Sequence, residues 1–262
     1  MKKHGMLAGL LVGLVWTASA SAAPIVVQDT YWGGKDNGYG DVIGDISKFD
    51  IQRLEVTQTE TSFVFNFFTN FAGQSGSHFQ SYTQGNTGIV YGDLFLASSW
   101  NPFGSAADNY KLDNASTGTL WTYGLVLNNR EGNSGGAVSL YALNGANNAD
   151  NALLSDEVMK GNATWRNGQE VLVDTQSATT SYLGDIGTWV VGSGVVSLIV
   201  DLSLTNLLSG DTLAFHWDMT CGNDVIEGEF AITSVVEPGS WLLLGVGLLG
   251  LGLTRRRLRH KM

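Results

Sequence analysis

The sequence is poor in cysteine, proline and charge: its 262 residues include one cysteine and three prolines, and only 15% of them are charged. A single cysteine excludes a small domain held together by disulfides, and three prolines exclude a collagen-like or proline-rich chain. Hydrophobic residues make up 44% of the chain, which is enough apolar surface for a core and argues against wholesale disorder. The lone Cys221 stands on the apolar side of an alternating segment, which favours a buried small hydrophobe over a reactive or metal-bound thiol.

Long hydrophobic runs are also missing. A short apolar run near the N-terminus has the pattern of a secretory signal peptide. Two lysines precede an apolar run over residues 6–16, which is too short to span a bilayer. Small residues follow it, and Ala20 and Ala22 suit the positions that signal peptidase reads. We expect residues 1–22 to be a signal peptide that directs the chain to the secretion machinery and is cleaved after Ala22; an uncleaved membrane anchor is the alternative.

The C-terminus combines a short motif, an apolar stretch and a basic cluster. The apolar stretch over residues 241–253 covers about 20 Å as a helix, whereas the hydrocarbon core of a bilayer is about 30 Å thick. It spans the bilayer if Pro238 begins the helix and the arginines that follow reach the interface. We expect a single marginal transmembrane helix within residues 235–262. Because basic residues prefer the cytoplasmic side, the body over residues 23–234 is expected to lie outside.

This three-part segment resembles the PEP-CTERM sorting domain, which exosortase-type membrane proteases recognise in exopolysaccharide-producing Gram-negative bacteria. The resemblance covers about residues 235–259, and Val236 stands where the family motif begins with proline. It implies an exosortase partner, a transient inner-membrane anchor and a final location at the cell surface or in the extracellular matrix. A plain C-terminal membrane anchor is the alternative. Carried over by position, the sorting residues are Val236, Glu237, Pro238, Gly239 and Ser240, with Arg255, Arg256 and Arg257 in the basic cluster.

The body between the two signals is strongly acidic. The signals hold seven of the 14 basic residues, so residues 24–235 carry 23 acidic and seven basic residues and a formal charge of −16. An exported domain of this charge is not expected to bind nucleic acid or anionic lipid. It could hold divalent cations instead.

Hydrophobic residues alternate with a period of two through most of the body, which predicts β-strands. Leu213, Phe215 and Trp217 alternate with Ala214 and His216, so one face is expected to be core and the other wet or nearly so. Trp121 is expected in the core for the same reason. Glycine- and asparagine-rich turns separate the strands, and a short helix is indicated within residues 150–160. We therefore expect an all-β fold over residues 23–234, an antiparallel two-sheet β-sandwich of jelly-roll type. The same alternation recurs in residues 61–68, 89–97, 120–128, 137–143 and 195–204.

Two blocks of the body extend the resemblance. Residues 215–228, and residues 41–45 leading into 49–51, are similar to blocks in PEP-CTERM surface proteins of unassigned function. They imply an exported β-sandwich family and no particular chemistry.

Few residues are suited to catalysis. The body has two histidines, His78 and His216, and the short match of residues 132–136 to a serine-protease signature has asparagine in place of aspartate and the wrong surroundings for its histidine. We expect no catalytic residues and interpret residues 132–136 as a hairpin loop.

A transition-metal site at His216 is a weak alternative. His216 and Asp218 share the polar face of one strand, and Asp224 and Glu227 follow it, but the spacing matches no recognised metal motif. A hydrogen-bonded histidine at a strand surface is the simpler interpretation.

Calcium is the cofactor that the acidic loops favour. Asp36, Asp41 and Asp45 lie in a glycine-rich turn that could curl around an ion, although their spacing is not that of an EF-hand. A solvated acidic turn without an ion is the alternative.

Loop aromatic residues suggest contact with sugars. Tyr31, Trp32 and Trp100 lie in loops beside polar groups, where exposed rings could stack on pyranose faces; packing over the ends of the sandwich is the alternative. We expect a non-enzymatic, exosortase-sorted surface or matrix protein that contacts exopolysaccharide. The alternatives are a carbohydrate-binding module and a secreted glycan-acting enzyme, which would need two carboxylates about 5–9.5 Å apart across a cleft.

Overall fold

The computed structural model describes residues 23–31, 40–59, 61–102, 118–145, 148–161 and 164–232, together with residue 245. The chain divides into two units, Ala22–Ser234 and the two terminal segments, and the description concerns the first. The expected signal peptide with its cleavage residues, the sorting motif, the transmembrane helix and the arginine cluster all lie outside the described residues. Within the described ranges, no helix has the length and apolar character needed to cross a membrane.

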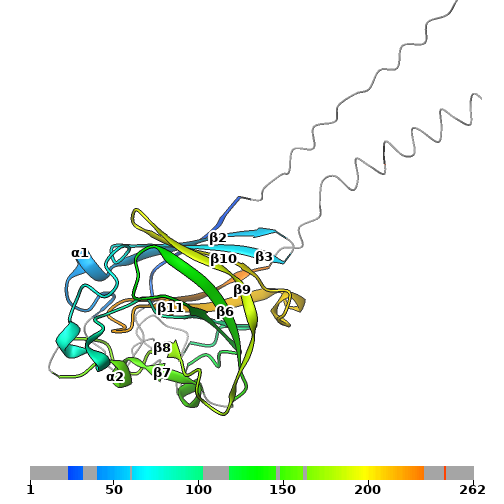
Figure 1. Ribbon diagram of the computed structural model, residues 1–262. Helices are drawn as coiled ribbons and strands as arrows, with labels where there is room; N and C mark the ends of the chain where they lie inside the picture. The colour runs from blue at the N-terminus through cyan, green and yellow to red at the C-terminus, as the bar shows by residue number, and fades with distance from the viewer. Residues whose placement is uncertain are drawn as a thin grey trace, which may run out of the picture. The chain divides into compact units, whose positions relative to one another are not determined.

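Among the described residues, ten strands form one antiparallel sheet in the order β1-β2-β3-β10-β9-β6-β5-β4-β11-β12. Figure 1 labels β2, β3, β10, β9, β6 and β11 of this sheet. A second sheet pairs β7 (Ala152–Leu154) with β8 (Glu170–Val173), and α2 (Ser155–Val158) is the short helix expected within residues 150–160. Helix α1 (Ile46–Phe49) precedes β2. The strands of the large sheet are β1 (Ile25–Gln28), β2 (Ile51–Thr59), β3 (Ser62–Thr69), β4 (Leu94–Ala97), β5 (Tyr123–Leu127), β6 (Gly135–Leu143), β9 (Thr180–Gly192), β10 (Val195–Asp201), β11 (Thr212–Asp218) and β12 (Val225–Ala231).

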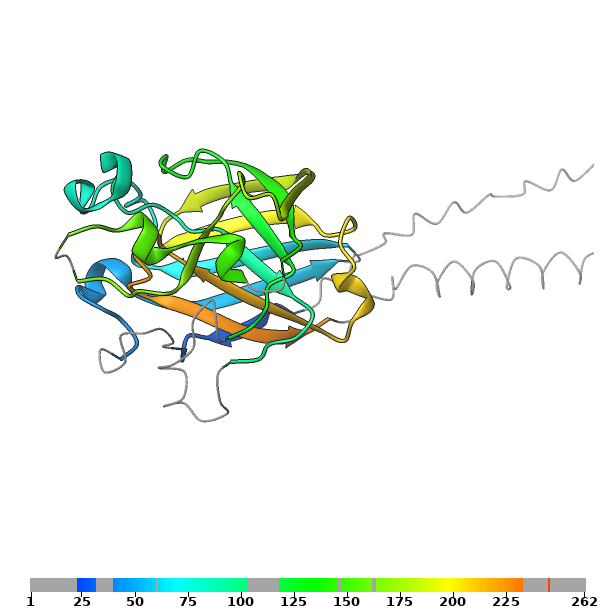
Figure 2. The same cartoon turned by 90° about the horizontal axis from the view of Figure 1, so that it is seen from below.

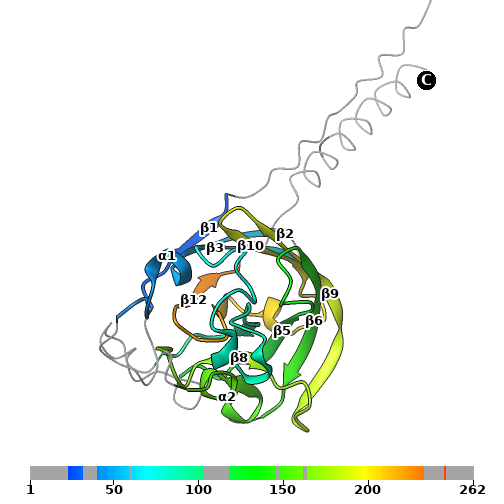
Figure 3. The same cartoon turned by 60° about the vertical axis from the view of Figure 1, so that its left-hand side comes forward.

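The large sheet curls until it is nearly closed into a barrel (Figure 3). Its edge strands β1 and β12 contact each other along what we call the seam, and they lie side by side in Figure 2. Each hydrogen-bonded pair in the sheet is antiparallel, so β1 and β12 run in opposite directions along the seam. Asp29, directly after β1, and Asp224, directly before β12, therefore lie at the same end of the seam.

The expectation of an antiparallel all-β fold is confirmed, but the arrangement of its strands differs from two separate jelly-roll sheets. The strands are hydrogen-bonded in one continuous sheet, whose two halves face each other across a core much as two sheets would. Register shifts between β6 and β9, at Val138/Ser139 and Leu140/Tyr141, mark bulges that bend the sheet. Alternation in the sequence tells which face a side chain takes, and it does not tell whether neighbouring strands continue one sheet. The hairpin expected at residues 132–136 joins β5 to β6.

The core inside the curled sheet is aromatic. Trp217 of β11 is fully buried, as expected, and its ring stacks on Phe67 of β3 with 4.5 Å between centroids. Cys221 lies in the same core, and burial raises the pKa of its thiol, so the group stays protonated. The interpretation of Cys221 as a buried small hydrophobe is confirmed.

A second core covers the opposite face of β4, β5 and β11, and on β11 this face was expected to be wet or nearly so. His216 and Ala214 of β11 are both fully buried, so this expectation is wrong. The small sheet β7–β8, which comes from a later part of the sequence, covers this face together with the ring of Trp121, which lies two residues before β5. The second core consists of Phe95, Ala97, Trp121, Val126, Leu143, Ala152, Val173 and Ala214.

Candidate functional site

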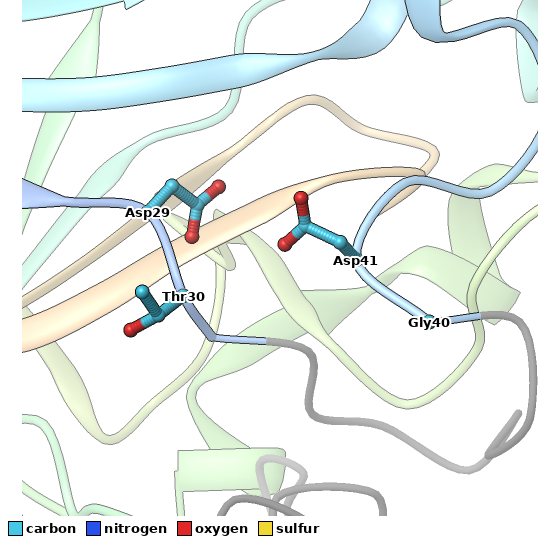
Figure 4. A pocket seen from close by; sticks show the side chains of 4 residues that line it. All are labelled: Asp29, Thr30, Gly40 and Asp41. Carbon is cyan, nitrogen blue, oxygen red and sulfur yellow. The ribbon is translucent and has the colours of Figure 1, made fainter.

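Acidic side chains converge at one end of the seam, where they line a cavity of about 350 Å³ that we call the acidic pocket. Figure 4 shows the carboxylates of Asp29 and Asp41 pointing toward each other from two separate segments, with Thr30 and Gly40 beside them. Asp224 joins them, and one oxygen from each of the three aspartates lies within 4.8 Å of the others. Two carboxylates therefore line the cavity, and the third, which is fully buried, lies beside them.

The edge strands place two of these three aspartates. Asp29 continues β1, and its amide donates to Gln52 O at 3.1 Å. Asp224 precedes β12, and its carboxylate accepts from the amides of Ile51 at 2.5 Å and Val225 at 3.0 Å. These hydrogen bonds join the first residues of β2 and β12 at the end of the seam. The pocket is thus built where the two edges of the sheet meet.

Arg166 supplies positive charge beside the acidic pocket. It is 1% exposed, and its guanidinium donates to three backbone carbonyls: Gly40 at 3.0 Å, Asp41 at 2.6 Å and Gly222 at 3.0 Å. Gly40 has φ +78°, in the left-handed region that favours glycine, which lets its carbonyl turn toward the arginine. Arg166 therefore ties the segment of Asp41 to the turn before β12.

The electrostatics of the acidic pocket favour a bound cation. Burial, and then repulsion from neighbouring aspartates, raises the pKa of Asp29 well above its ordinary value, and burial raises the pKa of Asp224 well above its own. Asp29 Oδ1 accepts from the Tyr31 amide at 3.2 Å, but Asp29 Oδ2 is buried and has no hydrogen-bond partner among the described residues. A buried carboxylate oxygen without a donor is costly unless a proton or a metal ion satisfies it.

The structure separates the aspartates of the expected calcium turn. Asp41 lies in the acidic pocket, whereas Asp45 caps α1, accepting from Ser47 N at 3.0 Å and pairing with Lys48 at 3.1 Å. Asp36 lies outside the described residues. The sequence did not predict Asp29 as a residue of the acidic pocket, and it grouped Asp224 with His216. Their positions at strand ends were the available signal, but which strands form the sheet edges cannot be read from the sequence.

The loop aromatics pack together. Tyr31 is 2% exposed, and its ring meets that of Trp100 edge to face with 6.5 Å between centroids. Trp100 is half-buried, and its indole donates to Glu227 at 2.7 Å. Trp32 lies outside the described residues. Tyr31 and Trp100 therefore pack against their neighbours, as the alternative to an open surface for stacking sugars expects.

A second set of ionisable groups, which we call the His216 cluster, comprises Glu170, His216, Asp218 and Glu227. His216 of β11 lies directly across from Glu227 of β12 in the sheet ladder, and its Nδ1 is 2.8 Å from Glu227 Oε2. Its Nε2 is 3.8 Å from Asp218 Oδ2. One ligand atom each from Glu170, His216 and Glu227 lie within 4.8 Å of one another. The small sheet contributes Glu170, the first residue of β8.

The His216 cluster is enclosed, and burial and the neighbouring charges shift the pKa values of its members. Burial lowers the pKa of His216, but the carboxylates of Glu170, Asp218 and Glu227 raise it by more, and the net pKa lies well above its ordinary value. Burial raises the pKa of Asp218 to about 7. The interpretation of His216 as a surface histidine is wrong, because its side chain is fully buried.

The two clusters suit different ions. The acidic pocket offers oxygen ligands, which calcium prefers, and the His216 cluster adds an imidazole, which suits transition metals. Comparison of the chain with protein-family models, with curated protein sequences and with solved structures found no match.

Proposed function

We propose that this protein is an exported, exosortase-sorted component of the cell surface or extracellular matrix, without enzymatic activity, whose acidic pocket holds calcium and contacts exopolysaccharide. The observation that carries the proposal is the meeting of Asp29, Asp41 and Asp224 within 4.8 Å of one another, beside a cavity of about 350 Å³ that Asp29 and Asp41 line. Calcium takes about six to eight oxygen ligands. Three aspartates supply only part of this set, which leaves positions for water or for the hydroxyl and carboxylate oxygens of a polysaccharide.

The two terminal signals and the body charge support the same proposal. The apolar segments at both ends match export and sorting signals, and a body at −16 has the charge to attract calcium outside the cell. Calcium bound between an acidic protein and an acidic polysaccharide reduces the repulsion between them.

Binding of the full-length protein to exopolysaccharide from the producing strain tests the calcium proposal. We expect co-sedimentation with the polysaccharide in calcium, its loss on chelation and its loss in Asp41→Asn. The control Asp45→Asn removes a carboxylate from the same turn, but this one caps α1, so binding should remain. The proposal would be contradicted by binding that persists after calcium is chelated, or by wild-type binding of Asp41→Asn.

Thermal unfolding gives a second measurement on the same variants. At calcium concentrations about 100 times its Kd, the ion stabilises the folded state by about 2.7 kcal/mol. For a domain of this size the melting temperature should rise by about 2–4 °C per kcal/mol. We expect the rise in the wild type and in Asp45→Asn and not in Asp41→Asn.

Intact-mass measurement of the exported protein tests the sorting proposal. We expect a chain that begins after Ala22 and lacks the apolar segment and the arginine cluster. Replacing Arg255, Arg256 and Arg257 together by alanine should leave the C-terminal segment in place. A wild-type species that still ends at Met262 would rule out processing.

A further inference from the structure

The His216 cluster holds more negative charge than its own groups can neutralise. Glu170, His216, Asp218 and Glu227 are at most 7% exposed, and their three carboxylates face a single imidazole. Even with the imidazole protonated, two negative charges stay without a counter-charge inside the cluster. The nearby Arg130 pairs with Asp93 at 2.7 Å. Burying charge in this way is costly, so the cluster requires protons or a cation.

Buried polar atoms without hydrogen-bond partners also indicate that the His216 cluster requires protons or a cation. Asp218 is fully buried, and neither of its carboxylate oxygens has a hydrogen-bond partner among the described residues; the same holds for His216 Nε2. These groups face each other at 3.8 Å, which is too long for a hydrogen bond. The opposite ring nitrogen, Nδ1, lies on the side of Glu227.

The surrounding residues have the arrangement that outer groups take around a bound metal. Trp121 Nε1 donates to Glu170, and Trp100 Nε1 donates to Glu227 at 2.7 Å. Asp218 Oδ2 lies 3.8 Å from His216 Nε2, so a small movement of the ring would let it accept a hydrogen bond from that nitrogen. Metal-binding carboxylates are normally hydrogen-bonded by neighbours, and a metal-binding histidine normally directs its other nitrogen at a carboxylate.

We propose that Glu170, His216 and Glu227 bind one divalent first-row transition-metal ion, with Asp218 orienting the imidazole. The ligand atoms lie within 4.8 Å of one another, so small side-chain shifts would allow metal bonds of about 2.0–2.2 Å, with Nδ1 and Glu227 Oε2 moving apart from their present 2.8 Å. A single imidazole with two carboxylates favours zinc or manganese over calcium, which takes oxygen alone. This site is independent of the acidic pocket and of the proposed function.

The position of the ligands indicates a structural role for the ion. Glu170 begins β8 in the small sheet, whereas His216 and Glu227 lie on neighbouring strands of the large sheet. One ion bound by all three would fasten β7–β8 over the outer face of β11. Because the side chains are buried beneath Trp100 and Trp121, the ion would have limited access to solvent.

Metal analysis and titration of the full-length protein test this proposal. Protein purified without chelator should contain about one equivalent of zinc or manganese, and the stripped protein should rebind Zn²⁺ or Mn²⁺ in calorimetry with excess Ca²⁺ present. Glu170→Gln should lose this binding, and Trp121→Phe should weaken it by about 10- to 100-fold. The control Glu229→Gln, two residues from Glu227 on β12 but exposed, should bind as the wild type does.

Three results would overturn the proposal. The first is a folded wild type that binds neither Zn²⁺ nor Mn²⁺ between pH 6 and 8, which would mean that protons alone neutralise the cluster. The second is a folded Glu170→Gln that keeps wild-type affinity. The third is loss of the same ion in Asp41→Asn, which would assign it to the acidic pocket. If Glu170→Gln does not fold, the wild-type titration and Trp121→Phe still decide the outcome.

Discussion

Replacing Arg166 by methionine is expected to lower the free energy of unfolding by about 3–5 kcal/mol, because it removes one partner from a buried charged network. The guanidinium of Arg166 serves the carbonyls of Gly40, Asp41 and Gly222 and faces the carboxylate of Asp224. Methionine fills a similar volume but leaves three carbonyls without this donor and the buried aspartates without this counter-charge.

Urea denaturation of wild type and variant measures this effect. The matched control is Arg53→Met, since Arg53 is one-third exposed and pairs with Glu55 at 2.8 Å on the surface. Surface pairs contribute about 0–1 kcal/mol, so this variant should unfold close to the wild type. A loss of less than about 1 kcal/mol in Arg166→Met would show that Arg166 does not stabilise the acidic pocket.

Replacing Asp93 by alanine is expected to cost a similar amount, about 3–5 kcal/mol. Asp93 is fully buried, and its carboxylate accepts from the amides of Leu127 at 3.0 Å and Val173 at 2.9 Å while pairing with Arg130. These contacts join the end of β5 to the end of β8. Alanine leaves two buried amides without their acceptor and the partly buried guanidinium of Arg130 without its counter-charge.

Denaturation again provides the measurement, with Asp201→Ala as the control. Asp201 is an exposed carboxylate that accepts a local hydrogen bond from Ser203 N at 2.9 Å. Its loss should cost about 1 kcal/mol or less. Asp93→Asn keeps one acceptor oxygen and should fall between the two alanine variants. Equal stability of Asp93→Ala and Asp201→Ala would refute the role given to Asp93.

The fold class could be predicted because alternation with a period of two is a local property. It identified strands such as β11 and placed Trp217 and Trp121 in buried positions. The same pattern misassigned the face of His216, since a polar side chain on a strand reads as solvent-facing. The β7–β8 sheet covers that face, and nothing local to β11 encodes this cover.

The candidate sites were only partly predictable, because each depends on contacts between segments far apart in the sequence. Asp41 was identified as an ion ligand within its own turn, but Asp29 and Asp224 meet it only because β1 and β12 become neighbours. Asp45, in the same turn as Asp41, serves as a helix cap, which local spacing could not distinguish from ion binding. Glu170 enters the His216 cluster from another sheet.

The direction of the strands along the seam determines at which end of the curled sheet the described body begins and ends. Because β1 and β12 are antiparallel, Ile25 at the start of β1 and Ala231 at the end of β12 lie at one pole of the curled sheet. Asp29 and Asp224 lie at the opposite pole. Both ends of the described body therefore lie at the pole away from the acidic pocket.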